Sequence, residues 1–487
     1  MMNEKNYLPR ALALMLCTLV ICLGMYYLPD HLLGYPVKKV DLLSDLREKP
    51  AEMTLDSLRR QLEAEALADT LEVDSVALRD SVRRAMGLDS AVLALRDSLY
   101  RVVSLSYGAD STGTHIEDYS LGHIGLQRFF AALGARDTLG RPVRVAFLGD
   151  SFIEGDILVA DFRSALQEAF GGRGVGFVPV TSVAAQCRPT IEQHASGWRT
   201  WSMMTDHEHD YTLSGMLFAP EKDYATLSLK NTDRYPELAE VSTFKVYYQH
   251  NRGTQLRWSE NGSADTLQVW LEPADTVTAF GRDGAFTSLD LRFTHTDSTF
   301  LALGVALEDD KGVVVDNYSL RGNSGQILHR LDSVQCRALN ACRTYDLVVL
   351  QYGLNVANDS VLQYGWYGRK MEESIRRIRA CFPTADVLLM GVSDRSRQLN
   401  GKFETMPSVL ALLHAQRQTA RRTGITFWNT FGAMGGENSM VQYVENNWAS
   451  KDYTHLGFPG GKRLAEILFD ALMKEKEFYD EAVREGY

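Results

Sequence analysis

The sequence lacks closely spaced cysteine pairs and extended runs of basic residues. Its six cysteines form no C-x-x-C pair, which argues against a zinc-binding or dithiol redox motif. Cys336 and Cys342 either form a disulfide in an oxidising compartment or are buried free thiols. The chain carries 51 lysines and arginines against 62 aspartates and glutamates, and its net charge of −11 argues against nucleic acid as the main partner.

Several familiar ligand and nucleophile motifs are also missing. No G-x-S-x-G is present, which argues against the nucleophile elbow of an α/β-hydrolase. The glycine-rich segment 171–177 follows a predicted helix and not a strand, so it lacks the context of a phosphate-binding fingerprint. His207 and His209 lie in the segment DHEHD, which is either a solvated loop or a metal site. We therefore expect neither a metal nor an organic cofactor.

Charge is absent from one segment near the N-terminus, Ala11–Leu28. Its 18 residues are just enough to cross a lipid bilayer. Lys5 and Arg10 precede it, which predicts a cytoplasmic N-terminus and places the rest of the chain in the periplasm or another extracytoplasmic space. Tyr26 and Tyr27 stand where a signal peptidase needs small residues, so the pattern favours an uncleaved single-pass anchor over a cleaved signal peptide.

The segment that follows has a helical pattern. Residues 40–105 are rich in Leu, Ala, Asp, Glu and Arg, with apolar residues at helical spacing. The pattern predicts a helical stalk, which could associate with itself although its heptads are irregular. The polar segment 106–115 is predicted to be a hinge.

Beyond the hinge, short apolar runs alternate with amphipathic helical patterns. The apolar runs lie at 143–148, 313–317, 346–351, 386–391 and 425–429. The helical patterns lie at about 158–170, 325–341, 367–382, 407–423 and 460–475. Alternation of strand and helix predicts a parallel sheet with helices on both faces.

A different pattern fills residues 177–310. Segments such as TFKVYYQ and SLDLRFTH alternate apolar and polar residues between turns, which predicts an antiparallel sandwich inserted into the α/β domain. This region contains Trp198, Trp201, Trp258 and Trp270. Tryptophans in a sandwich either belong to its core or stand exposed to stack on sugars.

Candidate functional residues follow four of the predicted parallel strands. Ser151 follows the first strand, Gly322 the second and Asn355 the third, while Asp452 and His455 follow the fifth. Functional sites in open parallel sheets form outside the carboxyl ends of the strands. We therefore expect these five residues to meet at one edge of the sheet.

The residue types match the needs of acyl transfer. His455 can take the proton of the Ser151 hydroxyl, and Asp452 can fix the imidazole tautomer and stabilise its positive form. A tetrahedral intermediate would place negative charge near the backbone N–H groups of Ser151 and Gly322 and the amide of Asn355. The sequence thus supplies a nucleophile, a base, an orienting acid and an oxyanion hole.

In order along the chain, GDS, the glycine of RGNSG, GLN and DYTH resemble the four blocks of the SGNH, or GDSL, hydrolases. Val356 follows the asparagine where the family often has Asp, and Asn358-Asp359 comes slightly later. The amide itself is retained, so the chemistry is expected to survive this departure. The resemblance implies catalytic roles for Ser151, Asp452 and His455, and an oxyanion hole formed by Ser151, Gly322 and Asn355.

The segment 149–180 resembles more narrowly the peptidoglycan O-acetylesterase branch, which carries an inserted sandwich similar to a carbohydrate-binding module. The resemblance covers about 140–475. It implies a flavodoxin-like three-layer α/β/α domain with a parallel sheet, interrupted by an antiparallel β-sandwich. Together with the N-terminal transmembrane helix and stalk, we expect these parts: tail and anchor 1–39, stalk 40–115, SGNH domain 116–176 and 311–487, and inserted sandwich 177–310.

The expected function is that of a membrane-anchored serine esterase that removes O-acetyl groups from an envelope polysaccharide such as peptidoglycan. Two alternatives use the same residues differently. An O-acetyltransferase would pass the acyl group from Ser151 to a sugar hydroxyl, and a non-catalytic scaffold would only bind the glycan. The expected partners are an acetylated polysaccharide and the membrane, and not a nucleic acid.

Overall fold

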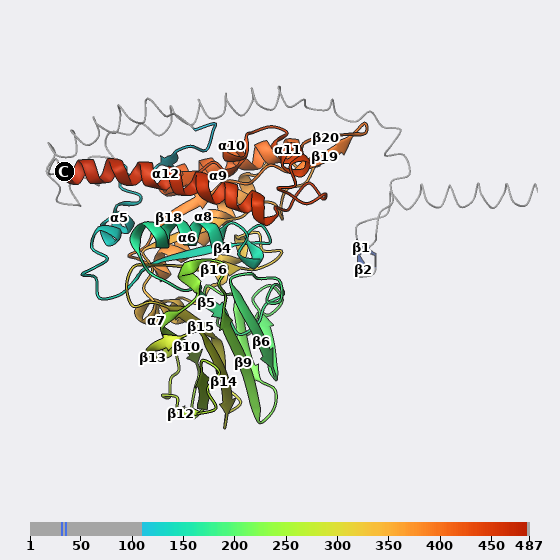
Figure 1. Ribbon diagram of the computed structural model, residues 1–487. Coiled ribbons are helices and arrows are strands. Elements are labelled where there is room, and N and C mark those ends of the chain that lie inside the picture. The colour runs from blue at the N-terminus through green and yellow to red at the C-terminus, as the bar shows by residue number, and fades with distance from the viewer. Residues whose placement is uncertain (1–30, 33–34, 37–109, 485–487) are drawn as a thin grey trace, which may run out of the picture. The chain divides into compact units, whose positions relative to one another are not determined.

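The structure is a computed structural model that describes residues 31–32, 35–36 and 110–484. The chain divides into two compact units, 1–61 and 62–487. In the first unit, the described strands β1 (His31–Leu32) and β2 (Tyr35–Pro36) pair antiparallel. The other described elements belong to the second unit (Figure 1).

A six-stranded sheet carries the predicted polar strand ends. Its strand order is β16-β4-β17-β18-β21-β3, in which every pair is parallel except β21 with β3. From β4 the chain moves to β16 on one side and then returns to β17 on the other, so the switch point of the sheet lies at the carboxyl ends of β4 and β17. The bounds are β3 Ile116–Asp118, β4 Val143–Gly149, β16 Val313–Ser319, β17 Leu347–Gln351, β18 Asp386–Met390 and β21 Thr426–Trp428.

Two layers of helices cover this sheet. Helices α5 and α6 both contact α12. Helix α8 contacts α7 and α9 (Figure 1). Because helices cover both faces of the sheet, every residue of VRVAFLG in β4 is buried, and the strand shows no alternation of apolar and polar residues. The helices are α5 Gln127–Gly134, α6 Val159–Phe170, α7 Ser333–Cys342, α8 Gly365–Cys381, α9 Pro407–Thr423, α10 Thr430–Met434, α11 Ser439–Glu445 and α12 Phe458–Arg484.

Two antiparallel sheets lie between α6 and β16 in the sequence. The inner sheet has the order β13-β10-β15-β8-β7 with β5 also paired to β15, and the outer sheet has the order β12-β11-β14-β9-β6. The inner strands are β5 Gly176–Pro179, β7 Trp198–Ser202, β8 Met216–Pro220, β10 Val241–Gln249, β13 Thr278–Phe286 and β15 Leu301–Glu308. The outer strands are β6 Ile191–Ser196, β9 Tyr224–Asn231, β11 Gln255–Glu260, β12 Leu267–Trp270 and β14 Ser288–Thr294.

The inner sheet belongs to two hydrophobic cores at once. Along β15, Ala302 and Val305 belong to the core between the two antiparallel sheets, whereas Leu303 and Ala306 belong to the core of the parallel sheet. Every residue of LALGVALE is therefore buried, which explains why this strand shows no polar alternation. The antiparallel sheets are thus packed against the parallel sheet and do not form a free-standing module.

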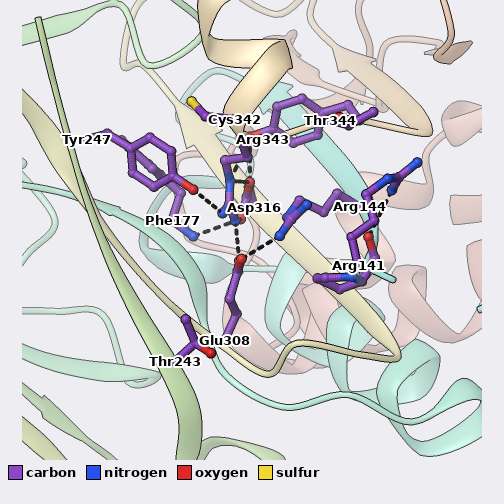
Figure 2. Close-up of polar contacts among 12 residues, drawn as sticks. Arg141, Arg144, Phe177, Thr243, Tyr247, Glu308, Asp316, Cys342, Arg343 and Thr344 are labelled. Carbon is purple, nitrogen blue, oxygen red and sulfur yellow. Dashed lines mark hydrogen bonds and ion pairs between the residues drawn. The ribbon is translucent and has the colours of Figure 1, made fainter. Parts of the chain in front are cut away.

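A buried ionic network joins the inner sheet to the parallel sheet (Figure 2). The Arg343 guanidinium donates from Nε and Nη2 to the two carboxylate oxygens of Asp316 in β16, both at 2.6 Å. Arg343 Nη2 also lies 2.7 Å from Glu308 Oε2 in β15, an ion pair without hydrogen-bond geometry. Arg144 in β4 donates to Glu308 Oε1 at 2.6 Å, and Arg343 donates to the Tyr247 hydroxyl in β10 at 3.1 Å.

The charges of this network are almost completely removed from water. Arg343 and Asp316 side chains are 0% exposed and Glu308 is 1% exposed. Burial alone would raise the pKa of Glu308, but the adjacent Arg144 and Arg343 lower that pKa to about 2. The carboxylates of Glu308 and Asp316 both have arginine partners. A buried charge that lost its partner would destabilise the fold strongly.

The predicted fold class is wrong as stated. It included a transmembrane helix, but within residues 110–484 and the two short N-terminal strands no helix is long and apolar enough to cross a membrane. The structure is a mixed α/β protein with several sheets, and the sheet predicted to be parallel ends in the antiparallel strand β3. The predicted span Ala11–Leu28 and most of the stalk at 40–115 lie outside the described residues.

One predicted helix is divided in two. The pattern at 325–341 predicted a single helix, but the structure has a short 3-10 helix, η4 (Gln326–Arg330), followed by α7. Asp332 caps α7, because its side chain accepts hydrogen bonds from the N–H groups of Val334 and Gln335. The domain limits 116–176, 177–310 and 311–487 stay a prediction, since residues 62–487 form one compact unit.

Arg343→Met should lower the free energy of unfolding by about 3–5 kcal/mol, because it leaves Asp316 without its cation in a dry environment. Arg282→Met is the matched control, since Arg282 is 43% exposed and pairs with Glu260 at the surface. The control should cost less than about 1 kcal/mol. Denaturant unfolding measures both, and equal losses would show that the network contributes no more than a surface pair.

Candidate active site

Ser151 lies directly beyond the carboxyl end of β4. A Cβ on Gly149 would approach the Ile153 side chain to 2.7 Å, so the strand must end in glycine for the turn to fold back. Asp150 is completely buried and accepts a hydrogen bond from the Phe152 N–H at 2.9 Å. The turn is thus held from inside, and Ser151 is left partly exposed at its surface.

The structure brings Ser151, His455 and Asp452 into one line of hydrogen bonds. Ser151 Oγ lies 3.0 Å from His455 Nε2, and His455 Nδ1 lies 2.7 Å from Asp452 Oδ2. Burial alone would raise the pKa of Asp452, but hydrogen bonds from the His455 side chain and from the backbone N–H groups of His455 and Thr454 lower it. Asp452 is therefore a carboxylate that can hold the imidazole with Nε2 facing Ser151.

The turn that carries Asp452 and His455 is fixed from outside by a hairpin, β19 (Ser396–Leu399) with β20 (Lys402–Thr405). Tyr453 has a φ of 55°, which a residue with a side chain rarely adopts. Its ring stacks on Phe403 with centroids 3.6 Å apart, and its carbonyl accepts from the Ser396 N–H at 3.1 Å. The sequence analysis missed this support because Phe403 is distant in sequence.

Gly322 lies beyond β16, on the opposite side of Ser151 from β17. Its φ of 78° is in the left-handed region, and a Cβ there would meet only Met204 Cε, at 3.9 Å. The glycine is therefore required by backbone conformation and not by crowding. Within the described part of the chain, the N–H groups of Ser151 and Gly322 have no hydrogen-bond acceptor, so both can donate to an oxyanion.

Asn355 lies beyond β17, but its amide is already engaged. Its Nδ2 donates to Asp150 Oδ2 at 2.8 Å and to the Asn323 carbonyl at 3.0 Å. These two contacts use both hydrogens of the amide. Asn355 would contribute to an oxyanion hole only by exchanging one of these partners, and that role stays a prediction.

Asp150 is a buried titratable group that the sequence analysis did not assign. Burial raises its pKa to about 6, although hydrogen bonds from Phe152 and Asn355 and the charge of His455 oppose the rise. Its carboxylate orients the amide of Asn355. The GDS tripeptide could have indicated this residue, because Asp150 directly precedes the candidate nucleophile Ser151.

A cavity of about 320 Å³ opens beside Gly322. Sandwich residues including Met204 and Met216 form one wall, and Tyr318 and Leu320 from the end of β16 form the other. The rim carries the ion pair between Arg321 and Glu154. The lining also includes the serines Ser182, Ser202, Ser214 and Ser319. An apolar pocket with a few hydroxyls suits a small amphipathic ligand.

No group of three or more His, Cys, Asp or Glu in residues 110–484 could hold a metal ion. His209, one of the two histidines of DHEHD, has its Nδ1 at hydrogen-bond distance, 3.0 Å, from Asp206 Oδ2. Asp359, the late acidic residue of the third block, lies 3.7 Å from Arg397. The chemistry that Ser151, His455 and Asp452 can perform together is nucleophilic acyl transfer.

Comparison with solved structures finds a similar fold. A peptidoglycan O-acetylesterase superposes with a TM-score of 0.59 at 21% identity, and the match covers 74% of this chain and 99% of that one. The chain shares the fold of this esterase. The predicted resemblance to the peptidoglycan O-acetylesterase branch of the SGNH hydrolases is thus confirmed at the level of the fold.

Two further esterases show much weaker likeness. A family two carbohydrate esterase from Cellvibrio japonicus has 10% identity and a TM-score of 0.25, covering 59% of this chain and 99% of its own. A family three carbohydrate esterase from Talaromyces cellulolyticus has 14% identity and a TM-score of 0.26, covering 33% and 72%. Scores this low carry no argument. No family model and no curated protein matches the chain.

Asp150→Asn should change how stability depends on pH. The pKa of Asp150 is raised in the folded state, so its contribution to stability is present below pH 4 and is lost as pH rises through about 6. The free energy of unfolding of the variant relative to wild type should therefore rise by on the order of 2–3 kcal/mol between pH 4 and 7.

Chemical denaturation at the two pH values measures this difference. Asp137→Asn is the matched control, because the side chain of Asp137 is 80% exposed and its charge is solvated in both states. A difference for Asp150→Asn that stays flat with pH would contradict the effect of burial.

Proposed function

We propose that this SGNH-type chain is a serine esterase that removes O-acetyl groups from a cell-envelope polysaccharide such as peptidoglycan. The observation that carries the proposal is the unbroken line from Ser151 Oγ through the His455 ring to Asp452, at 3.0 and 2.7 Å. The likeness in fold to a peptidoglycan O-acetylesterase supports the choice of substrate. Such a substrate places the site of action outside the cytoplasm.

The geometry supports a two-step reaction. Ser151 Oγ attacks the acetyl carbonyl carbon while His455 Nε2 takes the hydroxyl proton, and the N–H groups of Ser151 and Gly322 bind the oxyanion. The intermediate collapses to an acetyl-serine, and the sugar oxygen leaves with the proton from His455. Water then loses a proton to His455 and attacks the acetyl-serine, which releases acetate and restores Ser151.

Exposure of the base favours hydrolysis over transfer to a second sugar. The His455 side chain is 39% exposed and that of Asp452 is 49% exposed, so bulk water reaches the imidazole from the open side. A transferase must keep water away from its acyl intermediate. The open imidazole therefore favours the esterase reaction over the alternative O-acetyltransferase.

The cavity beside Gly322 is the proposed place for the sugar that leaves. Its volume of about 320 Å³ exceeds what an acetyl group alone would occupy. Water takes about 30 Å³ in the liquid, so the cavity matches about ten non-hydrogen atoms, the size of a sugar ring and not of a methyl group. The serines of the lining can bind its hydroxyls, and Met204 and Met216 can contact its apolar face.

Ser151→Ala should lower kcat on p-nitrophenyl acetate at least about a thousandfold and leave the fold intact, because only the nucleophilic oxygen is removed. Release of nitrophenolate measures the rate, and circular dichroism checks the fold. A sulfonyl fluoride should label Ser151 in the wild type. Surviving activity in the alanine variant, or labelling at another serine, would refute the assignment, and an inactive wild type would favour a non-catalytic scaffold.

Met216→Trp should raise KM for an O-acetylated N-acetylglucosamine by about tenfold, equivalent to about 1.4 kcal/mol of lost binding, because the larger side chain fills the cavity. Hydrolysis of p-nitrophenyl acetate should change little, since its acetyl group needs no sugar site. Steady-state kinetics on both esters provide the comparison. If KM rises equally for both, the cavity does not hold the sugar.

A further inference from the structure

Two aromatic side chains stand exposed on the outer antiparallel sheet, and they lie in one row. Trp270 in β12 is 56% exposed and Tyr224 in β9 is 48% exposed. Tyr224 is paired in register with Thr294 of β14, Thr294 with Gln255 of β11, and Gln255 with Trp270. Residues paired in register point to the same face of a sheet, so the row has an aromatic residue at each end and polar residues between them.

The other three tryptophans of the sandwich are less exposed than Trp270. Trp258 is 5% exposed and belongs to the core between the two sheets. Trp198 is half-buried, donates from Nε1 to the Thr226 carbonyl at 2.8 Å, and packs edge-on against Phe293. Trp201 is also half-buried. Of the four, Trp270 therefore has the large free ring surface that needs an explanation.

An arginine and a histidine accompany the row. The Arg292 guanidinium lies 4.0 Å from the centroid of the Tyr224 ring, and within residues 110–484 no carboxylate lies within ion-pair distance of it. The His295 ring lies 5.5 Å from the Trp270 ring. Between them is a hollow of about 450 Å³ lined by Lys222, Asp223, Tyr224, Arg292, Thr294, His295 and Thr296.

We propose that this platform, formed by Tyr224, Arg292, His295 and Trp270, binds a carboxylated glycan. The flat rings of Trp270 and Tyr224 offer apolar surface to the C–H face of sugar rings. Arg292 stacks on Tyr224 and has no carboxylate partner among the described residues, so its outer N–H groups can bind a carboxylate in a bidentate manner. Between the two aromatic ends, the hydroxyls of Thr294 and Thr296 line the hollow and can form hydrogen bonds with sugar hydroxyls.

The size of the platform favours a chain of sugars over a single ring. Tyr224 and Trp270 are three strand spacings apart, which is about 14 Å. The platform belongs to the outer sheet, whereas Ser151 and the cavity beside Gly322 belong to the parallel sheet and the inner sheet. It is therefore a second binding site, whose part is to hold the polymer and not to cleave its esters. The proposal does not depend on the chemistry at Ser151.

Binding of oligogalacturonate, a carboxylated glycan, by the full chain tests the proposal in an isothermal titration, with an uncharged cello-oligosaccharide of similar length beside it. Trp270→Ala should weaken binding of both glycans at least tenfold. Arg292→Gln should weaken binding of oligogalacturonate by a similar factor and leave the neutral glycan almost unchanged. Trp366→Ala is the matched control, because Trp366 is 43% exposed but lies on α8. It should bind like wild type.

The same proteins are assayed with p-nitrophenyl acetate, and unchanged rates would show that each variant is folded and that Ser151 is unaffected. The proposal is overturned if wild type binds no oligogalacturonate, or if Trp270→Ala and Arg292→Gln bind it as wild type does. Analytical sedimentation then measures whether the chain forms a dimer. A dimer that Trp270→Ala dissociates would show that the platform contacts a second copy of the chain, which also overturns the proposal.

Discussion

The arrangement of the molecule depends on the buried charges around Arg343. Its guanidinium bridges Asp316 in the parallel sheet and Glu308 in the antiparallel sheet, at 2.6 and 2.7 Å. Neither carboxylate is accessible to water, so neither sheet can move away without exposing a charge that has lost its partner. Packed apolar residues would hold the two sheets together equally well, but ion pairs with defined geometry also hold them in one orientation.

That orientation matters because the proposed site is assembled from both sheets. Ser151, Gly322 and Asn355 follow strands of the parallel sheet, whereas Met204 and Met216, which wall the cavity beside Gly322, come from the antiparallel insertion. Rotation of one sheet on the other would open the cavity without changing the distance from Ser151 to His455. Substrate binding and chemistry are thus supported by different parts of the fold, which is why their variants should separate KM from kcat.

The serine itself is positioned by groups that take no direct part in the reaction. Asp150 is buried beneath it and fixes both the turn, through the Phe152 N–H, and the amide of Asn355. On the other side, the stack of Phe403 on Tyr453 supports the turn that carries the imidazole and its carboxylate. The outer sheet then adds a surface that lies apart from this chemistry.

Local patterns in the sequence determined the strands that precede the polar residues and the order of those residues, because burial on both faces and turn chemistry act within a few residues. The candidate line of Ser151, His455 and Asp452 was predictable from its motifs, although α10 and α11 separate Asp452 and His455 from the preceding strand β21. The contacts that only the tertiary structure decided join residues far apart in the chain. Asn355 meets Asp150 across 205 positions, and β15 is buried on both faces because two cores meet on it. The local hydrophobic pattern of a segment cannot reveal such contacts, because they depend on how whole sheets pack against each other.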